Sequence, residues 1–106
     1  MFNNLTKLKI LDLSENKIWL KDNENLSILT EFLSKQQELE ELNLSWNNFD
    51  DQDAHNILVS LKNSDCVKTM KHLNIMHFPW RKKENCIEFA SILANAISLE
   101  SVNITF

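Results

Sequence analysis

The sequence contains no glycine and only one proline among its 106 residues. Phosphate-binding loops of the GxxxxGKS/T and GxGxxG types depend on glycine, because its missing side chain lets the backbone turn tightly and approach the phosphates. Both classes of nucleotide-binding loop are therefore excluded.

Long apolar stretches and a basic excess are also missing. No run approaches the roughly eighteen apolar residues of a transmembrane helix. The opening residues, MFNNLTKLKILDL, lack the basic-then-apolar layout of a signal peptide. We therefore expect no membrane association and a cytoplasmic protein, with delivery into a host cell as the alternative. Fifteen acidic against eleven basic residues, a net charge of −4, argue against a dedicated nucleic-acid binder.

The length and composition fit one small globular unit. A chain of this length predicts a single domain over residues 1–106. It is 43% apolar and 25% charged, which is ordinary for a folded protein and disfavours wholesale disorder or a fibrous structure. About 65% of the unfolded surface is buried when a chain of this size folds, so a limited core is expected.

An apolar pattern recurs along the whole chain, with repeats beginning near Leu8, Leu39, Met70 and Leu99. The first three copies are Leu8-x-x-Leu11-x-Leu13-x-x-Asn16-x-Ile18, Leu39-x-x-Leu42-x-Leu44-x-x-Asn47-x-Phe49 and Met70-x-x-Leu73-x-Ile75-x-x-Phe78-x-Trp80. The fourth copy, Leu99-x-x-Val102-x-Ile104, stops at Phe106. So many anchors at fixed offsets exclude a chance pattern, and internal repeats of this length indicate a solenoid.

Each copy combines two periodicities. The anchors alternate with polar residues, which predicts a short strand with one buried face. Apolar residues at helical spacing then follow in three groups: Leu26, Leu29, Phe32 and Leu33; Ala54, Ile57, Leu58 and Leu61; Phe89, Ile92, Leu93, Ala96 and Ile97. Candidate N-caps precede them at Asp22/Asn23, Asp50/Asp51 and Asn85. Because every copy runs the same way, the strands should stack in parallel.

These residues resemble the leucine-rich repeat, whose signature is LxxLxLxxNxI/F, in its ribonuclease-inhibitor-like type. The resemblance covers the chain from about Leu5 to Phe106, or three and a half repeats. It implies an α/β fold: a right-handed β-α superhelix with a parallel concave sheet and convex helices. It also implies that protein partners dock on the concave side. Two departures stand out, since the family's loop glycine is absent and Phe78 replaces the asparagine present as Asn16 and Asn47.

The ends of the repeat array lack obvious polar caps. Little more than Phe2 and Leu5 precedes the first predicted strand, and the last strand ends the sequence. An unpaired edge strand with an apolar flank favours association. We expect either a segment of a longer array or a homodimer formed through the uncapped ends.

The outward positions of the predicted strands define the candidate binding surface. Stacked repeats align four rows: Ile10, Glu41, His72 and Ser101; Asp12, Asn43, Asn74 and Asn103; Ser14, Ser45, Met76 and Thr105; Glu15, Trp46, His77 and Phe106. Anchors generally lie near the centre of an interface. The predicted partner-binding residues are therefore Asp12, Glu41, Trp46, His72, Met76 and His77. For Trp46 the alternative is that its ring lies down on the loop and covers Phe49.

The segment 77–83 breaks the repeat pattern most, with the only proline and the basic residues Arg81, Lys82 and Lys83. Such a run is usually a solvated charge cluster, although it could meet an acidic partner or a phosphate. Trp80 occupies a core column and is expected to be structural. Trp19 is expected to be a partly exposed loop residue.

No catalytic or metal-binding arrangement is predicted. Cys66 and Cys86 are most simply reduced thiols in a chain without an export signal, with a disulfide as the less favoured alternative. A zinc site from these cysteines with His72 and His77 lacks any CxxC or HxxxH spacing, and a cysteine–histidine nucleophile pair is no better supported. His55 is expected at a helix surface. We expect no cofactor.

The sequence therefore predicts a non-catalytic module for protein–protein interaction. Its concave sheet would be presented to a partner of unknown identity, and the acidic residues Asp12, Glu15 and Glu41 favour a partner with some basic character. The alternatives are a fragment of a larger sensor, GTPase regulator or microbial effector, or a self-associating repeat unit. Asn-x-Ser/Thr triplets at Asn4, Asn25, Asn43 and Asn103 reflect the abundance of asparagine more simply than glycan sites.

Overall fold

The computed structural model describes residues 6–15 and 23–105, with residues 23–26 described by their backbone alone. In this part of the chain four strands alternate with three α-helices: β1 (Ile10–Asp12), α1 (Asn23–Ser34), β2 (Glu41–Asn43), α2 (Asp51–Asn63), β3 (His72–Asn74), α3 (Lys83–Asn95) and β4 (Ser101–Asn103). A short 3-10 helix, η1 (Asp65–Lys68), follows α2. The expectations for Asp22, Trp19, Asn16, Ile18 and Phe106 lie outside the described residues.

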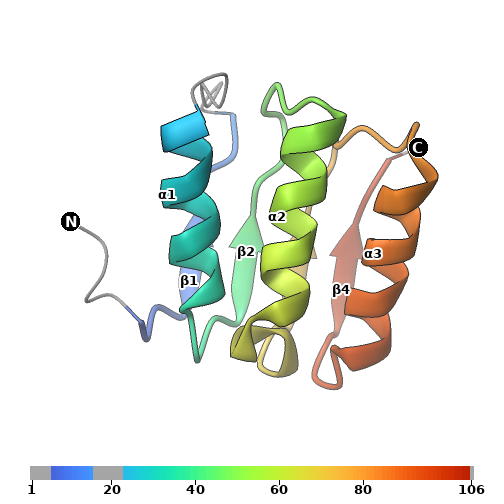
Figure 1. The fold of residues 1–106 in the computed structure, drawn as a ribbon. Coiled ribbons are helices and arrows are strands. Elements are labelled where there is room, and N and C mark those ends of the chain that lie inside the picture. Colours follow the sequence, from blue (N-terminus) through green and yellow to red (C-terminus); the bar gives the residue numbers. More distant parts are fainter. Residues whose placement is uncertain (1–5, 16–22, 106) are drawn as a thin grey trace.

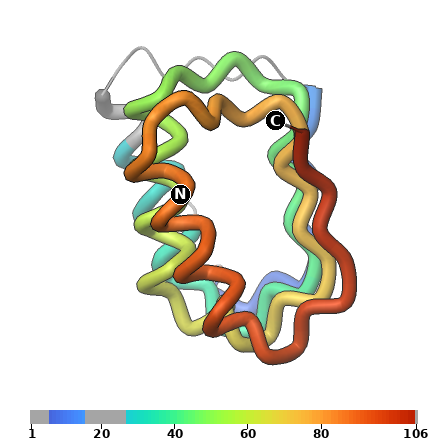
Figure 2. The backbone as a smooth tube through the Cα atoms, turned by 90° about the vertical axis from the view of Figure 1, so that its right-hand side faces the viewer, coloured from blue at the N-terminus to red at the C-terminus, as the bar shows by residue number. Residues whose placement is uncertain are grey.

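The elements form two layers. The strands make one parallel sheet in the order β1-β2-β3-β4, and the helices cover one side of it (Figure 1). Viewed along the sheet, the backbone closes into stacked loops with helices on one side and strands on the other (Figure 2). Each crossover from strand to helix to next strand is right-handed in Figure 1, the common hand for parallel β-α-β connections. The predicted α/β solenoid is confirmed.

The strand register follows the sequence repeat. Glu41 of β2 pairs with Ile10 on one side and with His72 on the other, and His72 pairs in turn with Ser101. A shift by one residue would turn every buried leucine to solvent, so the alternating pattern fixes the register strongly. The predicted alignment of the four copies is therefore confirmed by the pairing.

The repeat anchors fill the space between the sheet and the helices. The second and third copies supply the fully or nearly fully buried residues Leu39, Leu42, Leu44, Phe49, Met70, Leu73, Ile75 and Phe78. From α2 come Ala54, Ile57, Leu58 and Leu61. Anchors of the outer copies, such as Leu11 and Val102, are only partly buried, because each lies at an end of the stack.

Helix starts follow local hydrogen bonding. Asp50 caps α2, since its Oδ1 accepts from the Asp53 amide at 2.8 Å while Asp53 Oδ2 accepts from the Asp50 amide at 3.2 Å. Burial, together with the Asp50 carboxylate, raises the pKa of Asp53. The N-cap prediction for Asn85 is wrong: α3 is capped by Lys82, without a side-chain hydrogen bond, and Asn85 is fully buried inside the helix.

The third repeat replaces an asparagine hydrogen-bond network with aromatic packing. Asn47 Nδ2 donates to the carbonyl oxygens of Leu13 at 2.9 Å and Leu44 at 3.1 Å, so it links two repeats. At the equivalent position Phe78 packs edge-on against Phe49, with ring centroids 5.2 Å apart. The same ring contacts Trp80, whose ring contacts Phe89, at centroid distances of 6.2 Å and 5.1 Å. Trp80 packs against the core, as expected.

The last helix leaves an apolar stripe uncovered. Leu93 and Ile97 belong to the apolar residues at helical spacing, but they are 42% and 81% exposed. Leu93 continues a line of exposed residues with Cys86 and Ala90, at the spacing i, i+4 and i+7 along one side of α3, and Ile97 lies two residues beyond the end of the helix. The flank facing α2 is different, because there Glu88 forms an ion pair with Lys62. Within the described residues no further helix packs on the stripe, so helical spacing did not lead to burial at these two positions.

Candidate binding surface

The side of the sheet opposite the helices presents side chains in rows, and we call it the strand face. Its first row is Ile10, Glu41, His72 and Ser101, all exposed. His72 Nδ1 lies 2.7 Å from Ser101 Oγ, which links the last two strands. A shallow hollow of about 220 Å³ lies over this row and the next one. The structure thus brings the predicted residues Glu41 and His72 side by side on an open surface.

In the second row, the first two repeats form the same local hydrogen bonds, but only the first repeat carries a charged residue. Asp12 Oδ1 accepts from the amide and the hydroxyl of Ser14, at 2.9 Å and 2.6 Å. These bonds lower the pKa of Asp12, so its carboxylate remains ionised near neutral pH. Asn43 forms the same pair of bonds with Ser45, at 3.1 Å and 2.6 Å. Negative charge in this row is therefore confined to the first repeat.

The third row is less open than the sequence predicts. Ser45 was placed among the outward residues, yet it is only 2% exposed. Its hydroxyl is turned back to Asn43, and its carbonyl accepts the Glu15 amide at 3.0 Å. Met76, one of the predicted partner-binding residues, is half-buried. The third row is therefore open at Thr105, partly open at Ser14 and Met76, and closed at Ser45.

The strand exits carry the most unusual geometry of the described chain. Glu15, Trp46 and His77 occupy equivalent repeat positions and have positive φ angles of 57°, 59° and 74°. For bulky residues this left-handed backbone is uncommon and costs about 1–3 kcal/mol. Hydrogen bonds to the next repeat hold it, from the Trp46 amide to the Met76 carbonyl at 3.1 Å and from the His77 amide to Thr105 Oγ1 at 3.2 Å.

Trp46 and His77 stack on each other. Their ring centroids are 5.0 Å apart with an interplanar angle of 20°, close to the spacing of neighbouring strands. Trp46 remains 50% exposed. In this geometry the ring contact of Trp46 is thus with His77, whereas Phe49 packs against Phe78.

The basic residues near the sheet lie just before the strands begin or after they end. Before the strands, Lys9 and Lys71 flank Glu40, with nitrogen–oxygen distances of 3.6 Å and 3.4 Å. Both lysines lower the pKa of Glu40, Lys71 more than Lys9. After the strands, Arg81 is 82% exposed and lies 3.8 Å from Asp51. The predicted basic segment is thus at the surface, and part of its charge is already opposed by Asp51.

The cysteine and histidine side chains do not lie together at one site. Cys66 is buried in η1 and Cys86 is exposed on α3, and both thiols are free. Burial raises the pKa of the Cys66 thiol, which makes it a poor nucleophile. Among the described residues no group of three or more histidine, cysteine, aspartate or glutamate side chains is placed to hold a metal ion.

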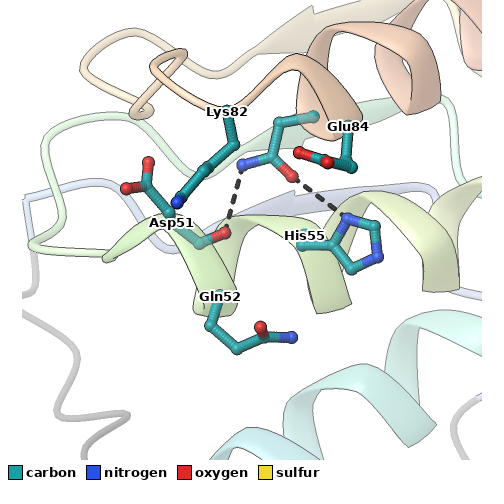
Figure 3. A pocket seen from close by; sticks show the side chains of 6 residues that line it. Asp51, Gln52, His55, Lys82 and Glu84 are labelled. Atoms are coloured by element: carbon teal, nitrogen blue, oxygen red, sulfur yellow. Dashed lines mark hydrogen bonds between the residues drawn. The ribbon is translucent and has the colours of Figure 1, made fainter.

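Sequence reasoning missed a polar connection between α2 and α3. Asn85 Nδ2 donates to the Asp51 carbonyl at 3.1 Å, and its Oδ1 lies 3.1 Å from His55 Nδ1 (Figure 3). These atoms line an open pocket of about 330 Å³ together with Gln52, Lys82 and Glu84. His55 was expected to be a plain surface residue. The 30-residue separation of His55 and Asn85, close to one repeat, is the signal that could have paired them.

The comparisons with known proteins address the repeat pattern. A family model described as leucine-rich repeat matches residues 4–18 and 35–57, which contain the strand-centred parts of the first two copies. No curated protein and no solved structure matches the chain. No helix in the described ranges has the length and apolar character needed to cross a membrane. The matched segments, the strand register and the two-layer architecture together show an α/β solenoid fold of the leucine-rich-repeat kind, and over the two matched segments the chain is similar to the leucine-rich-repeat family.

Proposed function

We propose that the chain is a non-catalytic protein-binding module that uses its strand face and strand exits as the contact surface. Leucine-rich repeats generally mediate protein–protein interactions and are typically non-catalytic. The observation that carries the proposal is the half-exposed Trp46, stacked on His77 beside the open row containing Glu41 and His72. Large, rigid aromatic side chains are the usual anchors of protein interfaces.

Rigidity is the proposed mechanism. The Trp46 backbone is fixed by its hydrogen bond to Met76, and its ring is held against His77. A side chain that is already ordered loses little conformational entropy when a partner docks. We infer that the left-handed backbone at the strand exits is maintained because it orders these anchors before binding.

The same proposal includes the type of repeat, the location of the protein and its place in a longer array. Each of the three helices spans 12 or 13 residues, which supports the ribonuclease-inhibitor-like type of repeat. We propose a cytoplasmic module, with delivery into a host cell as the alternative. A part of a longer array within a sensor, GTPase regulator or microbial effector would use the same surface.

Affinity capture tests the binding surface. The wild-type chain and the double variant Glu41→Lys/Trp46→Ala are used as baits in a lysate of the source cells, and in a host lysate if the source is a microbe. Both substitutions fall on exposed side chains, so the variant should fold. We expect at least one protein to be retained by the wild type and lost by the variant, as mass spectrometry would show.

A matched control isolates the effect of position. Glu84→Lys/Ile87→Ala makes the same kinds of change at an exposed acid and an exposed large apolar residue of α3. This control should retain the same proteins as the wild type. Identical capture sets for the wild type and the strand-face variant would contradict the proposal.

Self-association is a second candidate, favoured by the apolar stripe on α3 and by the outer edge of β4, which pairs with no strand among the described residues. Two copies related by a twofold axis could pack through the α3 and β4 surfaces. The dimer would be closed, because the stripe of each copy is then covered by the other copy. Light scattering should then give twice the 12.4 kDa mass of one chain. Ile97→Lys places a charge on an 81% exposed residue and should restore the monomer. Ile10→Lys, at a 63% exposed isoleucine of the strand face, should not. A monomeric wild type would contradict this candidate.

A further inference from the structure

The chemistry of the strand face indicates what kind of partner it fits, and this inference rests on the proposed function. The described rows of the strand face and the strand exits carry three carboxylates, those of Asp12, Glu15 and Glu41, and neither lysine nor arginine. No ion pair involves these three carboxylates within the described chain. Among the described residues, Lys9 and Lys71 lie beside the sheet and are paired with Glu40. Over residues 6–15 and 23–105 the face is therefore acidic, and no ion pair opposes its charge.

The acidic charge adjoins an aromatic ring with one covered side. His77 covers the side of Trp46 that is turned to the third repeat. Glu15 is the equivalent residue of the first repeat, and its amide bonds to Ser45, the residue before Trp46, at 3.0 Å. Since equivalent residues of adjacent repeats lie about one strand spacing apart, Glu15 flanks Trp46 on the side away from His77. The half exposure of Trp46 agrees with an uncovered second side.

An aromatic face beside a carboxylate suits a basic side chain, and a planar guanidinium best of all. Arginine stacks on indole rings through a cation–π interaction and donates several hydrogen bonds to carboxylates from the same plane. Lysine can supply the charge but not the stacked plane. We infer that the protein partner presents an arginine-containing basic segment, in which one arginine stacks on Trp46 and pairs with Glu15. Further basic residues of the segment meet Glu41 and Asp12.

Synthetic peptides provide the probe. Four twelve-residue peptides alternate serine with arginine, lysine, citrulline or glutamate. Citrulline has nearly the shape of arginine but no charge, so it separates the cation from the stacked plane. Binding is followed by the indole N–H signal of Trp46 in ¹⁵N NMR titrations, assigned through Trp46→Phe. We expect the arginine peptide to shift this signal and to bind most tightly, followed by the lysine peptide, then the citrulline and glutamate peptides.

Single substitutions then place the contact. Glu15→Gln removes the charge at an exposed residue and should weaken arginine-peptide binding about two- to fivefold. Trp46→Leu removes the stacking plane and should weaken it about fivefold. The matched control is Glu84→Gln, an exposed acid of α3, which should change the affinity little. Equal thermal unfolding of Glu15→Gln and the wild type would show that the fold is retained.

Three results would overturn the inference: arginine peptide binding no tighter than citrulline peptide, tighter binding of the glutamate peptide, or unchanged affinity in both Glu15→Gln and Trp46→Leu. Its failure is distinguishable from failure of the proposed function. A captured partner that depends on Glu41 and Trp46, together with a negative peptide result, would refute only the basic-segment inference. Identical capture sets together with arginine binding at Trp46 would refute the binding-module proposal in its stated form.

Discussion

Replacing Phe78 with asparagine is expected to destabilise the fold by about 3–5 kcal/mol, although it would restore the repeat pattern. Phe78 is only 4% exposed and contacts the rings of Phe49 and Trp80. The smaller asparagine would leave a cavity among these rings and would bring an amide into apolar surroundings. At position 47 the same amide is stabilising because carbonyl oxygens of Leu13 and Leu44 are within hydrogen-bond distance.

Urea unfolding followed by circular dichroism measures the effect. Phe78→Leu is the matched control, since it keeps an apolar side chain and should cost about half as much or less. A free energy of unfolding for Phe78→Asn within about 1 kcal/mol of the wild type would contradict the prediction. It would mean that an asparagine at this position finds loop carbonyls as Asn47 does.

Leu44→Ala is expected to cost about 2–5 kcal/mol of the free energy of unfolding. Leu44 follows β2 in the middle of the sheet and has no solvent-exposed surface. Its removal leaves a cavity between the central repeats, where the neighbouring leucines cannot fully close it. Since small domains are stable by only about 5–15 kcal/mol, this single change would remove a large share of the stability.

An exposed apolar residue of the neighbouring strand is the control for Leu44→Ala. Ile10 lies in β1 and is 63% exposed, so Ile10→Ala should change the unfolding free energy by no more than about 0.5 kcal/mol. Denaturant curves of the two variants should therefore differ by several kcal/mol. Equal effects would mean that the two residues do not face opposite sides of the sheet.

The strand exits couple stability to the proposed binding. Left-handed backbone at Glu15, Trp46 and His77 opposes folding, yet it places the indole and imidazole rings in one stack. A residue that strains the backbone but exposes an aromatic ring is typical of a functional position. Natural proteins tolerate such strain because they keep little more stability than their function requires. These three positions therefore include the proposed interface anchor, Trp46, and their backbone conformation lowers the stability of the fold.

Much of the fold followed from the sequence because the repeat specifies it locally. The spacing of Leu42 and Leu73 fixed both the strands and their pairing, since alternate residues must face one core. The stacking partners Glu41 and His72 could be identified for the same reason. Asp50 could be identified as a helix start because capping depends on residues a few positions apart.

Other features depend on contacts between distant residues. Whether Leu93 is buried depends on what packs against the far side of α3, which helical spacing alone does not determine, and Ile97 lies beyond the end of that helix. Ser45 is buried because its hydroxyl bonds back to Asn43 and not outward. The pairing of His55 with Asn85 needs two helices at a particular distance and rotation.

The sequence by itself determined the repeat length, the order of strands and helices, and the rows of residues on the strand face, because apolar periodicity decides which side of each element is buried. Only the tertiary structure decided that Trp46 stacks on His77 with half its surface open. That arrangement depends on backbone angles at the strand exits and on hydrogen bonds between repeats. Such contacts arise only after the repeats have stacked.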